Sequence, residues 1–247
     1  MRTLLLATAL LAASTRLPAQ VPAAPAAVRD STFHIIPVRP VEELRAEALR
    51  QSPPPQGDSL RSPDLVDLAG LDSGIHFDIR YATANNFMRA PMYSSARAFL
   101  QRPAAEALLR AQRALFARGF GLLIHDAYRP WYVTWMFWEA TPPRYHSFVA
   151  NPARGSKHNR GCAVDLTLYD LATGQPVGMP STYDEFSERA HPDYAGGTPR
   201  QRELRALLRS AMEAEGFTVD PGEWWHFDYR DWASYPVLNL PFESLGR

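Results

Sequence analysis

The sequence is poor in cysteine and in lysine, and each scarcity limits what the protein can be. Its single cysteine, Cys162, rules out an intramolecular disulfide. Lys157 is the only lysine, so arginine carries almost all of the positive charge, and the formal net charge is zero. With no basic surplus, we expect no nucleic-acid partner. The 46% of hydrophobic residues are enough for one sizeable core.

The sequence also has little that could cross a membrane, and we expect no membrane span. Its N-terminal apolar run, residues 4–13, is too short for a bilayer. Arg2 precedes this run and a Leu-Pro-Ala sequence at 17–19 offers a cleavage site, as in a secretory signal. We predict that residues 1–19 are a signal peptide and that the mature protein is exported, to the periplasm or the medium. No cysteine lies near the cleavage point, so we expect no lipid anchor.

Proline, alanine and serine are frequent in residues 20–63, which is the composition of a linker. Within this segment, residues 41–51 could form one short amphipathic helix, to which we assign no function.

Behind the linker, strands and helices are mixed without a regular β-α-β order. Alternating or continuous apolar residues predict strands at 75–81, 121–128, 163–168 and 224–229. Apolar residues at helical spacing predict helices at 103–118, 131–139 and 198–215, the first and last ended by a glycine. We therefore expect an α+β fold, a single domain with a central antiparallel sheet flanked by helices.

Two short segments carry the residues of a metal site. His158 and Asp165 lie seven positions apart, and Glu223 and His226 follow near the C-terminus. Two imidazoles and a carboxylate suit Zn²⁺ with one open coordination position, and a nearby glutamate is the base that such a site needs. Either segment alone is weak evidence, because a histidine or an aspartate beside a strand is usually structural. The chain has no His-Glu-x-x-His sequence, so it is not a zincin.

Strand geometry sets two further expectations. Glu223 stands three residues before His226, so strict alternation would point the two side chains to opposite faces. The Pro-Gly pair at 221–222 offers a turn or a bulge that could bring them together. Cys162 alternates with Asp165 and should point away from the metal, so we expect a buried small side chain rather than a ligand or nucleophile.

The patterns SxHxxGxAxD at 156–165 and ExWH at 223–226 resemble those of the M15 zinc peptidases, which cut D-alanyl-D-alanine bonds. The closer resemblance is to the D-Ala-D-Ala dipeptidase subgroup. Segments 81–87, 126–130, 165–169 and 223–227 agree with it in the same order. The resemblance runs from about Leu65 to the C-terminus, and it implies a catalytic domain over residues 64–247 with zinc in a cleft.

The resemblance implies a role for seven residues. His158, Asp165 and His226 match the ligands of one zinc ion per chain. Glu223 matches the catalytic base, and Arg129 matches the arginine that steadies the transition state.

Ser156 and Asp184 match positions associated with binding of the dipeptide, and Asp184 is implied to bind its free amino group. Lys157 departs from the family, since a serine is more usual beside the first ligand.

Three functions remain open at this point. The leading hypothesis is zinc-dependent hydrolysis of a small D,D-dipeptide, D-Ala-D-Ala, to two D-alanines in cell-wall turnover, with no protein partner implied. The second is a D,D-carboxypeptidase that trims D-alanine from peptidoglycan stem peptides, and the third is a non-catalytic, zinc-stabilised peptide-binding domain. Glu223 argues against the third, and Asp184 favours the first over the second. Export would distinguish this protein from the resistance dipeptidases, which work in the cytoplasm.

Overall fold

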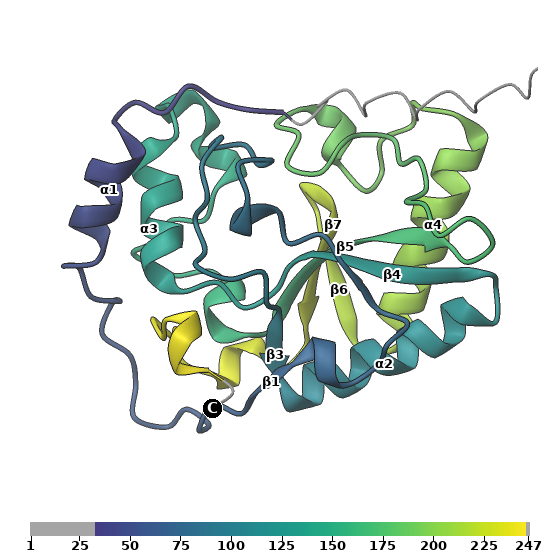
Figure 1. The fold of residues 1–247 in the computed structure, drawn as a ribbon, viewed down its shortest axis with the longest axis horizontal. Helices are drawn as coiled ribbons and strands as arrows, with labels where there is room; N and C mark the ends of the chain where they lie inside the picture. Colours follow the sequence, from purple (N-terminus) through teal and green to yellow (C-terminus); the bar gives the residue numbers. More distant parts are fainter. Residues whose placement is uncertain (1–32, 246–247) are drawn as a thin grey trace, which may run out of the picture. The chain divides into compact units, whose positions relative to one another are not determined.

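The computed structural model describes residues 33–245, and the predicted signal peptide lies outside these residues. A five-stranded sheet in the order β2-β4-β5-β7-β6 forms the centre (Figure 1). Its strands are β2 (His76–Phe77), β4 (Phe120–Asp126), β5 (Ala163–Asp170), β6 (Phe217–Asp220) and β7 (Glu223–Tyr229). A separate antiparallel pair joins β1 (Leu65–Asp67) to β3 (Phe99–Gln101). The α+β prediction is confirmed.

The antiparallel prediction holds for four of the five central strands. β5 pairs antiparallel with both β4 and β7, and β6 pairs antiparallel with β7. β2 is parallel to β4, which corrects the expectation for that edge. The strand expected at 75–81 is also too long, because the chain leaves the sheet after Phe77 and turns into a 3-10 helix at Arg80–Ala82.

A buried amide, that of Asn86, holds the loop that follows this segment. The Nδ2 atom of Asn86 donates to the carbonyl oxygens of Arg80, Thr83 and Ala90 at 3.3, 2.6 and 2.9 Å. These bonds satisfy backbone carbonyls between Arg80 and Ala90, of which only that of Arg80 belongs to the predicted strand. Alternating apolar residues in the sequence indicated burial correctly but not the backbone conformation.

Two helices, α2 (Arg102–Phe116) and α4 (Pro199–Ala214), pack against the sheet and against each other (Figure 1). Their buried leucines carry the predicted helical spacing. Thr198 begins α4 with a capping box, in which its hydroxyl accepts from the Gln201 N–H and the Gln201 side chain accepts from the Thr198 N–H. A third helix, α3 (Trp131–Ala140), begins directly after Pro130. No helix of the described part has both the length and the apolar character needed to cross a membrane.

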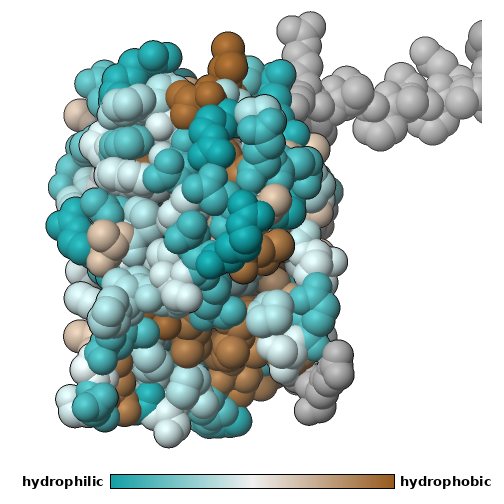
Figure 2. Space-filling model, turned by 90° about the vertical axis from the view of Figure 1, so that its left-hand side faces the viewer, coloured by the Kyte–Doolittle hydropathy of each residue, from teal (hydrophilic) through white to brown (hydrophobic). Residues whose placement is uncertain are grey.

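The packed unit begins earlier than the boundary expected at residue 64. Helix α1 (Val41–Ala48) lies against α3, and its Leu44 and Ala48 side chains are fully buried. Ahead of the helix, the Ile35 N–H donates to the Phe87 carbonyl at 2.9 Å. Figure 2 shows the α1 side of the molecule, where apolar patches lie among hydrophilic residues. Residues 33–48 are therefore part of the folded domain, although their composition resembles a linker.

This packing makes a prediction about stability. Leu44→Ala should lower the free energy of unfolding by about 2–5 kcal/mol, because it leaves a cavity between α1 and α3. Leu49→Ala, one residue after the same helix, is the matched control, since Leu49 is 63% exposed and its loss should cost less than about 0.5 kcal/mol. Urea unfolding followed by circular dichroism measures both. Equal stability of the two variants would show that α1 is not part of the cooperative fold.

Candidate active site

The structure brings together the three side chains expected to bind zinc. Asp165 on β5 lies directly opposite His226 on β7 in the strand register, so both side chains project from the same face of the sheet. His158 lies in a 3-10 helix, His158–Arg160, that is ended by Gly161 at φ 66°. A Cβ at Gly161 would lie 2.4 Å from the Leu65 side chain, so this turn requires glycine.

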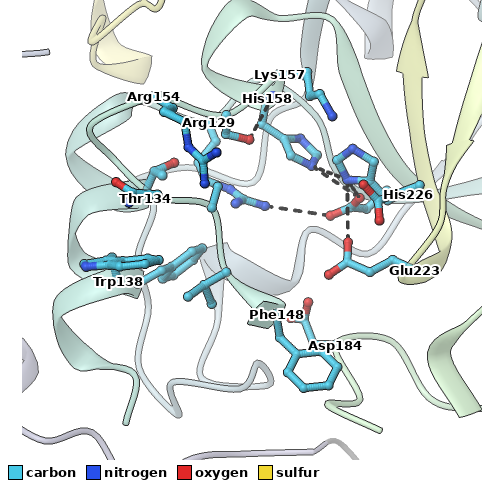
Figure 3. Close-up of a pocket in the computed structure, with 18 of the residues that line it drawn as sticks. Arg129, Thr134, Trp138, Phe148, Arg154, Lys157, His158, Asp184, Glu223 and His226 are labelled. Carbon is cyan, nitrogen blue, oxygen red and sulfur yellow. Dashed lines mark hydrogen bonds and ion pairs between the residues drawn. The ribbon is translucent and has the colours of Figure 1, made fainter. Parts of the chain in front are cut away.

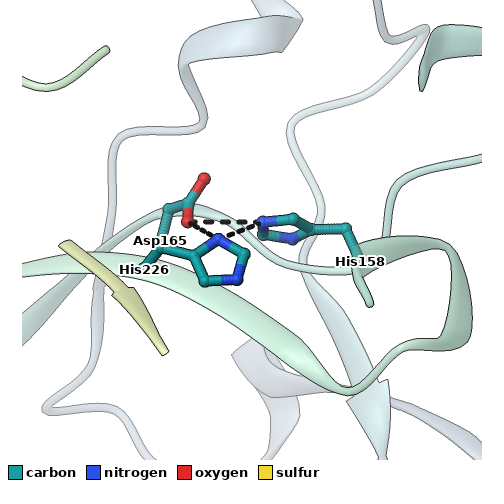
Figure 4. A group of neighbouring side chains, drawn as sticks. All are labelled: His158, Asp165 and His226. Carbon is teal, nitrogen blue, oxygen red and sulfur yellow. Dashed lines mark hydrogen bonds and ion pairs between the residues drawn. The ribbon is translucent and has the colours of Figure 1, made fainter. Parts of the chain in front are cut away.

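The three ligand atoms form a nearly equilateral triangle (Figure 4). Asp165 Oδ1 lies 3.3 Å from His158 Nε2 and 3.1 Å from His226 Nδ1, and the two nitrogens are 3.1 Å apart. Tetrahedral zinc with bonds of about 2.0–2.1 Å needs ligands roughly 3.3 Å apart. Asp165 Oδ1 is also buried without a hydrogen-bond partner. Donor types, spacing and this unsatisfied oxygen all fit a zinc ion held by three protein ligands.

Neighbouring groups fix the orientation of both imidazoles. His158 Nδ1 lies 2.7 Å from the Ala127 carbonyl oxygen, so this nitrogen carries the proton and Nε2 presents its lone pair to the site. His226 Nε2 lies 2.8 Å from Asp228 Oδ1, which leaves Nδ1 to face the site. The second oxygen of Asp228 pairs with Lys157 Nζ at 2.8 Å. Lys157, which replaces the more usual serine, therefore contacts the carboxylate of Asp228 that orients His226.

The Asp165 carboxylate is oriented in a similar way. Its Oδ2 atom accepts a hydrogen bond from the Tyr183 hydroxyl at 2.9 Å, and Arg129 Nη2 lies 3.8 Å away. Both partners hold Oδ2 and leave Oδ1 directed at the two histidines. Such a carboxylate is suited to bind a metal through one oxygen, which keeps a coordination position open.

A bulge places Glu223 beside the metal ligands, as expected from the Pro-Gly pair. The register between β6 and β7 shifts after Val219, so that Asp220 pairs with Glu223. Glu223 Oε2 consequently lies 3.7 Å from His226 Nδ1 (Figure 3). About a quarter of the side chain (24%) is exposed, at the wall of the pocket. Desolvation of the Glu223 carboxyl in the pocket raises its pKa to about 8.

Arg129 is held rigidly at the end of β4. Its Nε and Nη2 atoms donate to Asp126 Oδ2 at 3.0 and 2.7 Å, and its guanidinium lies over the rings of Tyr81 and Phe137. Burial alone would lower the pKa of Arg129, but the charge of Asp126 outweighs it and the pKa stays well above its ordinary value. A permanent, immobile cation therefore lines the pocket next to the ligand triangle.

Asp184 lies in the same pocket and has no cationic partner among the described residues. Its backbone is left-handed, with φ 58°, and its two carboxylate oxygens accept from the Tyr81 hydroxyl at 3.0 and 2.9 Å. Burial, together with the charges of Asp165 and Glu223, raises the pKa of Asp184 well above its ordinary value. A buried carboxylate in this state is stabilised by any cation that enters the pocket.

The remaining expectations concern Ser156 and Cys162. Ser156 lines the pocket, where its hydroxyl accepts from the His158 N–H at 3.2 Å. Cys162 is fully buried and does not line the pocket, and burial raises the pKa of its thiol to about 12. A thiol of this kind is neither a ligand nor a nucleophile here.

Sequence reasoning missed several residues that complete the site. The Tyr81 hydroxyl donates to Asp184 and the Tyr183 hydroxyl donates to Asp165, and neither tyrosine was assigned a role from the sequence. Asp126 lies in a segment that resembles the family, and a register shift between Ile124 and Asp126 aims it at Arg129. A buried polar residue in an otherwise apolar strand was the signal that could have identified it.

Comparison with known proteins agrees with this geometry. A peptidase M15 family model, described as D-Ala-D-Ala dipeptidase, matches residues 61–243. The D-alanyl-D-alanine dipeptidase of Escherichia coli (strain K12) is 38% identical over 183 residues, which cover 74% of this chain and 93% of that protein. The enzyme of the same name from Enterococcus faecium is 37% identical over 187 residues, covering 68% of this chain and 92% of that protein.

Among solved structures, a vancomycin-resistance D,D-pentapeptidase in complex with Zn(II) has a TM-score of 0.39 and 16% identity. The match covers 73% of this chain and 84% of that chain. A likeness at this level supports no argument about function.

The ligand triangle can be tested by metal analysis. We expect about one Zn²⁺ per chain in the purified protein and a loss of tight binding in His158→Ala, because two ligands hold zinc far less firmly than three. His191→Ala is the matched control, since His191 is exposed and does not line the pocket. Elemental analysis after dialysis measures both variants. Stoichiometric zinc in His158→Ala would show that the metal binds elsewhere.

Proposed function

We propose, from the premise that this chain belongs to the D-Ala-D-Ala dipeptidase family, that it hydrolyses the dipeptide D-Ala-D-Ala to two D-alanines. The family assignment follows from the matched model and from relatives at 37–38% identity, and it confirms the resemblance in the sequence. One observation supports the substrate most strongly. A buried carboxylate without a cationic partner, Asp184, shares one pocket with the ligand triangle and Glu223.

Zinc bound by His158, Asp165 and His226 would supply Lewis acidity, which polarises the scissile carbonyl and makes water a better nucleophile at neutral pH. Glu223 is placed to take the proton from the attacking water at Oε2 and to deliver it to the nitrogen of the leaving amine. A positioned acid–base group of this kind contributes roughly 10²–10⁴-fold to the rate. A divalent cation nearby favours the ionised form of Glu223, which is the form that acts as base.

Arg129 is suited to stabilise the negative charge that develops on the carbonyl oxygen of the scissile bond. Two of its nitrogens, Nε and Nη2, are fixed by Asp126. Because the guanidinium is already held in place, no rearrangement opposes the new bond. By analogy with oxyanion-hole donors, this contribution is about 10²–10³-fold.

Asp184 is suited to bind the free ammonium group of the dipeptide. An ammonium beside Asp184 forms a buried ion pair and removes the cost of an unpaired carboxylate. Ser156 lines the same pocket, so its hydroxyl is a candidate partner for the remaining part of the dipeptide.

The second candidate is a D,D-carboxypeptidase, which would use the same metal centre. Its acylated peptide substrate has no ammonium at the position facing Asp184, so that carboxylate would stay unpaired. This difference favours the dipeptidase.

We also propose that the protein is exported and serves cell-wall turnover, on the basis of the N-terminal sequence.

A conservative substitution separates catalysis from metal binding. Glu223→Gln keeps the shape of the side chain, so the protein should retain its zinc and lose at least about 10²-fold in kcat. Glu203→Gln on the exposed face of α4 is the control and should behave like the parent protein. Zinc content and D-alanine release are measured on the same samples. Unchanged turnover would remove Glu223 as the base, and loss of zinc would make it a ligand.

Asp184 separates the two peptidase functions. Asp184→Asn should raise KM for D-Ala-D-Ala, because the ammonium loses its charged partner, whereas Asp193→Asn on the surface should not. N-acetyl-D-Ala-D-Ala should be a poor substrate of the parent protein for the same reason. Steady-state kinetics with both dipeptides and a muramyl pentapeptide tests this assignment. Equal cleavage of the acylated substrates would favour the carboxypeptidase.

A further inference from the structure

The pocket is much larger than the dipeptide in the proposed reaction. Its volume is about 690 Å³. Cavities of roughly 300–1,000 Å³ commonly hold drug-sized molecules, whereas both side chains of D-Ala-D-Ala are methyl groups. Contacts with the two ends and with the scissile bond therefore account for only part of the lining. The rest of the wall is available to other parts of a substrate.

An aromatic surface forms much of this remaining wall. Phe148 ends the 3-10 helix Pro143–Phe148, and its ring stacks on that of Phe186, with centroids 4.9 Å apart and planes 4° from parallel. Both rings line the pocket and neither is fully buried. The rings of Trp138 and His146 pack at a tilt of 31°, with centroids 4.0 Å apart, and line the same pocket. Apolar surface of this kind, left partly open beside a reaction site, is suited to bind an apolar side chain.

Packing from behind holds this surface in place. The Phe186 ring lies 4.8 Å from Phe33 and 5.3 Å from Phe87, measured between centroids. Phe87 is itself buried in the core. The aromatic wall is thus a preformed surface, and binding to it requires little ordering of protein side chains.

The position of the wall identifies which part of a substrate would reach it. Phe186 follows Asp184 by two residues, and Figure 3 shows Phe148 and Asp184 at the same end of the pocket. In a dipeptide, the ammonium group and the first side chain leave the same Cα atom. An ammonium bound to Asp184 therefore places the first side chain within reach of Phe148 and Phe186.

We propose that Phe148 and Phe186 form a subsite for the side chain of the first residue, so that the enzyme cleaves dipeptides with a bulky apolar D-residue before D-alanine. The inference rests on the proposed dipeptidase function and extends its substrate class. The reaction is the same hydrolysis. Water adds across the amide bond, its hydroxyl to the acyl carbon and its proton to the amine, and two free amino acids leave.

The test compares kcat/KM for D-Ala-D-Ala, D-Leu-D-Ala and D-Phe-D-Ala. The parent protein should cleave the two bulky dipeptides at least as efficiently as D-Ala-D-Ala. In Phe148→Ala, the ratio of kcat/KM for D-Phe-D-Ala to that for D-Ala-D-Ala should fall about 10-fold or more, as for lost methylenes in an apolar pocket. Phe148→Leu restores apolar surface and should recover part of the ratio.

Phe116→Ala is the matched control, because Phe116 is 40% exposed at the end of α2 and does not line the pocket. It should leave the ratio unchanged. Cleavage of D-Ala-D-Ala with rejection of both bulky dipeptides would overturn the subsite and leave the proposed function intact. Failure to cleave any of the three would overturn the proposed function itself. An equal loss for all substrates in Phe148→Ala would show that Phe148 only supports the fold.

Discussion

The site depends on one pairing in the sheet, that of Asp165 on β5 with His226 on β7. Residues directly opposite one another share a face, so this register places a carboxylate and an imidazole 3.1 Å apart without any contribution from a loop. If the pairing of β5 with β7 shifted by one residue, one of the two side chains would point to the opposite face of the sheet. His158 completes the triangle from a short turn, and the Ala127 carbonyl fixes its ring. Two of the three ligands are thus held by the central sheet and the third by a short turn.

Negative charge dominates the interior around this triangle. Arg129 offsets part of it, and the hydroxyls of Tyr81 and Tyr183 donate to two of the carboxylates. Buried carboxylates are costly unless cations accompany them. A divalent metal at the triangle and, in the proposed function, the substrate ammonium at Asp184 would supply this compensation. The acidic groups that surround the site are Asp126, Asp165, Asp184, Glu223 and Asp228.

The sequence predicted those features whose cause is local. Glycines ended α2 and α4 as expected, and the Pro-Gly pair before Glu223 indicated the bulge that the structure contains. Features set by distant contacts were not predictable in this way. Helix α1 is part of the domain because its buried Leu44 lies where α1 packs against α3, and the strand predicted at 75–81 ends at Phe77, before a 3-10 helix. Nor could spacing reveal that the Tyr183 hydroxyl would meet Asp165.

The central claim is that this triangle, occupied by zinc, serves hydrolysis of D-Ala-D-Ala. The most direct measurement is D-alanine release by the purified parent protein before chelation, after chelation and after zinc is returned. The account predicts release from D-Ala-D-Ala that chelation abolishes and zinc restores, with no comparable release of alanine from L-Ala-L-Ala. Release that chelation leaves unchanged, or a zinc-loaded protein that does not cleave D-Ala-D-Ala, would contradict it.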